Sequence, residues 1–159
     1  MSYIIERLLA ENPNSIFVFD VDGVLASYEY TDYNHGYPEY VWENIVMKGD
    51  PYQEARPFKV MQEFISQHLE NCYICSVCCN DNEMWMKADF IKRHYQIDES
   101  HMYFTNTKEE KLEVLDDIHL NHSELEPRHI CMIEDTVDTL NYIQEYSEFS
   151  TVHVSSFFA

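Results

Sequence analysis

Glycine, proline and basic residues are all scarce in this chain. Its 159 residues include only three Gly and five Pro, which excludes collagen-like and low-complexity disordered proteins. Lys and Arg number 10 against 29 Asp and Glu, for a formal net charge of −19. Because a surface of this charge repels phosphate backbones and anionic lipids, we expect neither duplex nucleic acid nor a membrane as a partner.

Long apolar runs are also missing. No stretch approaches the ~20 apolar residues of a membrane span. The first residues, MSYIIERLLAENPNS, contain charged side chains in place of a secretory signal. We therefore expect a cytoplasmic protein.

Five cysteines are present, and four of them lie between positions 72 and 79. An odd number of cysteines without a signal sequence predicts free thiols in a reducing compartment. The spacing of Cys72, Cys75, Cys78 and Cys79 suggests a zinc or iron–sulfur site. However, the segment around Cys75 is typical of a buried strand, in which Cys is a common core residue. We favour this structural interpretation and keep the metal site as an alternative.

Short apolar runs alternate with helical patterns of apolar residues along the chain. The predicted strands cover 16–20, 72–77, 102–105, 129–133 and 151–154. The predicted helices cover 2–11, a segment following Pro57 with Phe58 to Leu69, a stripe from Trp85 to Tyr95, a segment beginning near Lys108, and 136–147. This alternation predicts an α/β fold with a parallel five-stranded sheet covered on both faces. The length predicts a single domain, 1–159, with a Tyr-rich insertion at about 26–56.

Acidic residues follow the first and the fourth predicted strands. Asp20 and Asp22 follow the first, and Glu134 and Asp135 end the fourth, with Asp138 close behind. Parallel strands place their carboxyl ends at one edge of a sheet, so these carboxylates should converge there. They would repel one another without a divalent cation, and Mg²⁺ prefers such oxygen ligands. Asp135 is the best-placed ligand of the second cluster, although it could also cap the following helix. Glu134 or Asp138 could assist directly or through water.

Four motifs, in order, resemble those of the haloacid dehalogenase (HAD) superfamily. IFVFDVDG, which contains Asp20 and Asp22, resembles its first motif, and Ser76 at a strand end matches the second. Lys111 resembles the lysine of the third, with Lys108 as the alternative. ICMIEDTVD resembles the acidic fourth motif, with Glu134 where Gly or Asp is usual. The resemblance implies a HAD-like Rossmannoid three-layer sandwich with a small flap or cap insertion.

The same resemblance implies a Mg²⁺-dependent phosphatase that acts on a small phosphorylated substrate. Asp20 would be the nucleophile that forms an aspartyl-phosphate, and Asp22 would protonate the leaving alcohol and later activate water. Ser76 would hydrogen-bond a phosphoryl oxygen, and Lys111 would offset negative charge. Asp20, Asp135 and the backbone carbonyl of Asp22 would hold Mg²⁺. The alternative is a catalytically silent HAD-like binding or regulatory protein.

The Tyr-rich insertion is too short for a large cap, so we expect an open site covered by a flap. Its aromatic residues could stack on a substrate ring or pack as a small core of their own. Arg56 could reach a substrate anion, although pairing with neighbouring acids is the favoured interpretation. The segment that contains Trp85 and Lys87 resembles the corresponding region of 5′-nucleotidase-like HAD members. A nucleotide is therefore a candidate substrate, ahead of sugar phosphates, and an open site would also admit a phosphopeptide.

Overall fold

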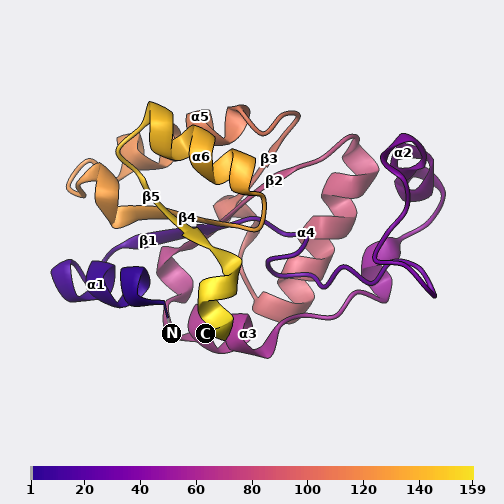
Figure 1. Cartoon of the computed structure of the whole chain (residues 1–159), viewed down its shortest axis with the longest axis horizontal. Helices are drawn as coiled ribbons and strands as arrows, with labels where there is room; N and C mark the ends of the chain where they lie inside the picture. Colours follow the sequence, from indigo (N-terminus) through magenta and orange to yellow (C-terminus); the bar gives the residue numbers. More distant parts are fainter. Residues whose placement is uncertain (1) are drawn as a thin grey trace.

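The computed structural model describes residues 2–159 and contains one parallel sheet of five strands, in the order β3-β2-β1-β4-β5 (Figure 1). The strands are β1 (Ile16–Phe19), β2 (Cys72–Val77), β3 (Met102–Thr105), β4 (Ile130–Glu134) and β5 (Ser150–His153). This architecture is the predicted HAD-like Rossmannoid α/β fold. The central position of β1, between β2 and β4, brings the ends of these three strands together.

Six α-helices and five short 3₁₀ segments accompany the strands within the described residues. The α-helices are α1 (Tyr3–Glu11), α2 (Glu39–Lys48), α3 (Lys59–Gln67), α4 (Asp81–Tyr95), α5 (Glu110–Asn121) and α6 (Val137–Tyr146). The 3₁₀ segments are η1 (Pro51–Gln53), η2 (Leu69–Asn71), η3 (Glu99–His101), η4 (Pro127–His129) and η5 (Val154–Phe158). Figure 1 shows α5 and α6 together over one face of the sheet, and α2 at the opposite end of the molecule from α1.

Alternate residues of the strands supply two separate cores. In β1, Phe17 and Phe19 pack with α1, α3 and α4, whereas Ile16 and Val18 face α5 and α6. The same alternation continues in β2 and β4. All four β1 side chains are buried because both faces of the sheet are covered, which explains the unbroken apolar run of this strand.

Three details differ from the sequence prediction. Trp85, assigned to the apolar stripe of its helix, is 61% exposed, whereas Lys87 is buried. The ends of α6 also differ, since Val137 and Tyr146 are exposed. Helix α2, inside the Tyr-rich insertion, was not predicted, because its apolar residues show little helical periodicity. Only Val46 of this helix is buried.

Within residues 2–159, no helix has both the length and the apolar character that crossing a bilayer requires.

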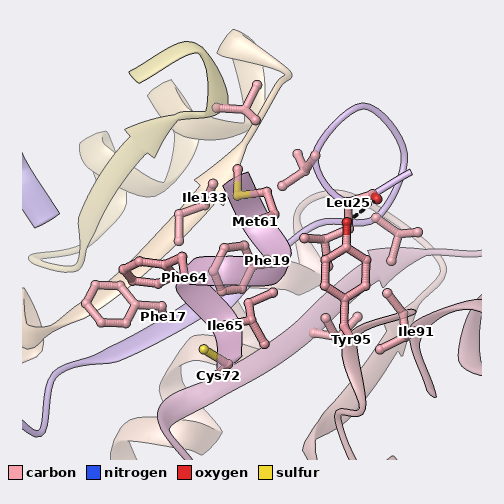
Figure 2. Close-up of a cluster of buried hydrophobic side chains, with 14 of the residues drawn as sticks. Phe17, Phe19, Leu25, Met61, Phe64, Ile65, Cys72, Ile91, Tyr95 and Ile133 are labelled. Atoms are coloured by element: carbon pink, nitrogen blue, oxygen red, sulfur yellow. Dashed lines mark hydrogen bonds between the residues drawn. The ribbon is translucent and has the colours of Figure 1, made fainter. Parts of the chain in front are cut away.

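Tyr95, at the end of α4, fixes the loop that follows β1. Its buried hydroxyl donates to the Leu25 carbonyl oxygen at 2.5 Å and accepts from the Phe58 backbone nitrogen at 3.0 Å. Figure 2 shows the Tyr95 ring beside Ile91, with its hydroxyl directed at Leu25. One side chain thus joins α4, the start of α3 and the loop that begins with Asp20.

Replacing Tyr95 by Phe should destabilise the protein by about 1–3 kcal/mol, because the buried Leu25 carbonyl loses its hydrogen-bond donor. Urea unfolding of Tyr95→Phe measures the difference. Tyr146→Phe, at an exposed position, is the matched control and should change the free energy of unfolding little. Equal effects of the two substitutions would show that Tyr95 does not anchor this loop.

Candidate active site

The carboxyl ends of β1, β2 and β4 surround a depression of about 220 Å³. Its lining contains most of the predicted site residues, namely Asp20, Asp22, Ser76, Lys108, Lys111, Glu134 and Asp135. Asp138 is exposed and does not line this depression. Residues separated by more than 100 positions in the sequence are therefore brought to one edge of the sheet.

Lys111 pairs with two carboxylates at the base of the depression. Its Nζ donates to Glu134 Oε2 at 2.6 Å and lies 3.3 Å from Asp20 Oδ1, and all three side chains are buried. Lys108 lies exposed at the rim, so Lys111 is the lysine in contact with Asp20. Burial raises the pKa of Asp20 to about 7, and the charge of Lys111 opposes this rise.

Three carboxylates form a candidate cation site. Asp20, Glu134 and Asp135 each offer an oxygen, and these oxygens lie within 4.8 Å of one another. Glu134 is already occupied, because Oε2 accepts from Lys111 and Oε1 accepts from the backbone nitrogens of Asp135 and Thr136 at 3.0 and 3.3 Å. Asp20 and Asp135 are therefore the better donors, while Glu134 orients the loop that carries Asp135. Asp138 lies outside the group.

Elsewhere in residues 2–159, no comparable group of metal-ligating side chains occurs. The cysteines are free, and four of them are buried. Burial raises the pKa of these buried thiols, to about 12 for Cys72, Cys75 and Cys78. The geometry therefore agrees with the structural interpretation of the cysteine run.

Gly23 allows the loop after β1 to approach the acidic group. Its φ of 76° lies in the left-handed region, and an added Cβ would stand 2.2 Å from Asp135 Oδ2. A larger residue would clash with this carboxylate as well as strain the turn. The glycine of the first motif thus has a physical role in bringing the β1 and β4 ends together.

The side chain of Asp22 is not part of the candidate cation site and has other partners. Its Oδ1 accepts hydrogen bonds from the Tyr30 and Tyr52 hydroxyls at 2.6 and 2.8 Å, and its Oδ2 lies 3.0 Å from Lys87 Nζ. Burial acts to raise the pKa of Asp22, but Lys87 and the two phenols outweigh it and lower the pKa. The backbone carbonyl of Asp22 is the part that could reach a cation.

Lys87 belongs to the site, although sequence reasoning gave it no role there. Its Nζ donates to Ser76 Oγ at 2.9 Å and to the Val77 carbonyl at 2.7 Å, and lies 3.6 Å from Glu83 Oε2. Burial acts to lower its pKa, but the neighbouring acids raise the pKa above the usual lysine value. The signal available in the sequence was its i,i+4 spacing between Glu83 and Ile91, on the buried side of α4. Because Ser76 accepts from Lys87, its own hydroxyl proton is free for another partner.

Some aromatic residues of the insertion pack on the core, and others border the site. Tyr52 is fully buried and Tyr30 nearly so, whereas Tyr28 and Tyr37 are half exposed. The insertion therefore packs on the core and also borders the site. Arg56 forms an exposed ion pair with Glu29 and does not line the depression, as expected for a loop residue.

Replacing Lys87 by Met should destabilise the protein by about 3–5 kcal/mol, because the Asp22 and Glu83 carboxylates would lose the cation that compensates their burial. Lys92→Met, which breaks only an exposed pair with Glu99, should cost about 1 kcal/mol or less. Thermal unfolding of both variants makes the comparison. A small effect at Lys87 would mean that its charge does not hold these acids.

The metal-free protein should become less stable relative to Asp20→Asn as the pH rises. The folded pKa of Asp20, about 7, lies above its ordinary value of 3.8, so the stability due to its protonated form is lost as the pH rises through about 7. Melting curves in chelator should show an advantage of Asp20→Asn at about pH 8 that shrinks by about pH 5. Asp116→Asn, an exposed acid on α5, is the control. An advantage independent of pH would contradict the account.

Among the comparisons with known proteins, the likeness to a solved structure bears on the fold. No family model and no curated protein matches the chain. A solved structure from Burkholderia xenovorans LB400, described as a haloacid dehalogenase-like hydrolase, matches with a TM-score of 0.56 and 13% identity. The match covers 91% of this chain and 84% of that one. At this identity the likeness establishes that the two chains share a HAD-like fold.

Proposed function

We propose that this protein is a Mg²⁺-dependent phosphohydrolase that acts on a small phosphomonoester through an aspartyl-phosphate at Asp20. The observation that carries the proposal is the convergence of Asp20 and Asp135 with Lys111 and Ser76 around one depression. The order of these residues along the chain is that of the four HAD motifs. The fold shared with a structure described as a haloacid dehalogenase-like hydrolase supports the hydrolase part of the proposal.

The donor set fits a hard divalent cation. Asp20 and Asp135 would hold Mg²⁺ through carboxylate oxygens, together with the backbone carbonyl of Asp22 and water. When bound, the ion would neutralise charge between the attacking carboxylate and the phosphoryl oxygens. Lys111 adds a fixed positive charge directly beside Asp20 in this strongly acidic chain.

In the first step, a carboxylate oxygen of Asp20 attacks phosphorus and the bond from phosphorus to the leaving-group oxygen breaks. Ser76 would donate its hydroxyl proton to a phosphoryl oxygen, since its own oxygen accepts from Lys87. The leaving oxygen takes a proton from the protonated form of Asp22, as the motif implies. The product of this step is the free alcohol and an aspartyl-phosphate.

In the second step, Asp22 takes a proton from water, and the water oxygen attacks phosphorus. The bond from phosphorus to the Asp20 oxygen breaks, and inorganic phosphate leaves. The contacts of Asp22 with Tyr30, Tyr52 and Lys87 favour its carboxylate form, which is the form that this second step uses. The proton taken from water returns Asp22 to the protonated form that the first step requires. The buried carboxylate is thus oriented by residues from both the insertion and α4.

A catalytically silent HAD-like binding protein is the second candidate. The observation that favours it is the same set of contacts, because a carboxylate held by two phenols and a lysine is less free to exchange protons. Both candidates require the same fold, and the assay below distinguishes them. A cytoplasmic location stays part of the proposal and fits the free cysteines.

Hydrolysis of p-nitrophenyl phosphate with Mg²⁺ tests the proposal. The wild-type protein should release phosphate and lose this activity in chelator, and Asp20→Asn should lower kcat by at least about 10³-fold because it removes the nucleophile. Asp135→Asn should raise the Mg²⁺ concentration required, whereas Asp116→Asn should change neither quantity. Equal activity in wild type and Asp20→Asn would refute the nucleophile, and complete inactivity of the wild type would favour the silent protein.

A further inference from the structure

A second cavity, of about 770 Å³, opens beside the catalytic depression. Asp22 and Tyr28 line both, so the two spaces adjoin at the proposed proton-transfer residue. The remaining wall comes from the insertion, between Tyr30 and Trp42. Whatever is joined to a phosphoryl group at Asp20 would extend past Asp22 into this space.

Aromatic rings form much of the wall of this cavity. Tyr30 is 5.4 Å from Trp42 and 5.7 Å from Tyr28 between ring centroids, and Tyr37 lies 6.5 Å from Trp42. Hydrogen bonds hold two of these rings in place, since the Trp42 indole donates to Glu83 at 2.6 Å and the Tyr30 hydroxyl donates to Asp22. Tyr28 and Tyr37 remain 45% and 38% exposed, so their rings have surface available for stacking.

The cavity has no basic side chain among the residues that line it, apart from His35. Its charged lining is acidic, from Asp22 and Glu39. A ligand with a second phosphate or a carboxylate would face these acids without a compensating lysine or arginine. The chemistry of the wall therefore matches an uncharged, planar group.

We infer that this aromatic cavity binds the leaving group of the substrate, and that this group is an uncharged planar ring, either an aryl group or the base of a nucleoside monophosphate. The inference rests on the proposed function for the position of the phosphate. It also predicts that ring compounds bind to an inactive variant such as Asp20→Asn. Aryl and nucleoside esters share the same recognition chemistry, and the experiment separates them.

The test compares the hydrolysis of 2-naphthyl phosphate, a nucleoside 5′-monophosphate and glycerol 2-phosphate. One or both ring esters should have a KM at least about tenfold below that of the glycerol ester, because ring stacking adds binding that glycerol lacks. Tyr37→Leu should raise KM for the preferred ring ester by about tenfold and leave that of the glycerol ester unchanged. Tyr33→Leu, at a 96% exposed position of the same insertion, is the matched control. Equal KM for all three esters, or an equal KM change for ring and glycerol esters, would overturn the inference.

Binding to Asp20→Asn, measured by calorimetry, separates this inference from the proposed function. Naphthyl phosphate or the nucleoside monophosphate should bind to this variant, and adding Tyr37→Leu should weaken that binding about tenfold. A nucleoside diphosphate should bind more weakly than the monophosphate. Binding that depends on Tyr37 without hydrolysis by the wild type would remove the proposed function and support the cavity assignment. Hydrolysis without ring binding at this cavity would support the proposed function and refute the cavity assignment. The stronger of the two ring ligands identifies the source of the ring.

Discussion

Two buried lysines hold the carboxyl-terminal edge of the sheet together. Lys111 lies between Asp20 and Glu134, and Lys87 lies between Asp22 and Glu83. Buried carboxylates are costly without a compensating charge. Removing one partner of such an ion pair leaves the other charge buried and uncompensated in a low dielectric. Because the chain has only 10 basic residues, the placement of two of them in the site is a defining constraint of this fold.

The acids near the two lysines have different proposed roles. The Lys111 pair leaves Asp20 and Asp135 as the carboxylates able to bind a cation, since Glu134 is used to orient the β4 loop. The Lys87 pair connects Asp22 with Ser76 and with α4, and the phenols of Tyr30 and Tyr52 add the insertion to the same network. The aromatic insertion is therefore hydrogen-bonded to the proposed proton-transfer residue. The position of the second cavity thus depends on the same residue that would move protons in the reaction.

Much of this arrangement could be predicted from the sequence because it follows from periodicity and strand order. The buried run before Asp20 and the acids after 130–133 identify two strand ends, and the parallel topology then brings Asp20 and Asp135 together. The contact of Lys111 with Asp20 also matches its expected place. These features depend on local patterns and on a rule that holds for all such sheets.

The remainder depends on tertiary packing. The burial of Lys87 in place of Trp85 is set by the acids that α4 meets across the site, which the helical pattern alone does not reveal. The rotation of Asp22 toward Tyr30 and Tyr52 depends on how the insertion folds back, over a separation of up to 30 positions. Helix α2 has little apolar periodicity and is held by contacts of Trp42, such as its hydrogen bond to Glu83.

The central claim, that Asp20 carries the phosphoryl group, is tested most directly by trapping the intermediate. The protein is mixed with p-nitrophenyl phosphate and Mg²⁺, quenched, and reduced with borohydride, which converts an aspartyl-phosphate to homoserine. Peptide mass spectrometry should then find homoserine at position 20 in the wild type, with Asp22 and Asp135 unchanged. Turnover with no modification at position 20, or modification of another residue in its place, would contradict the account.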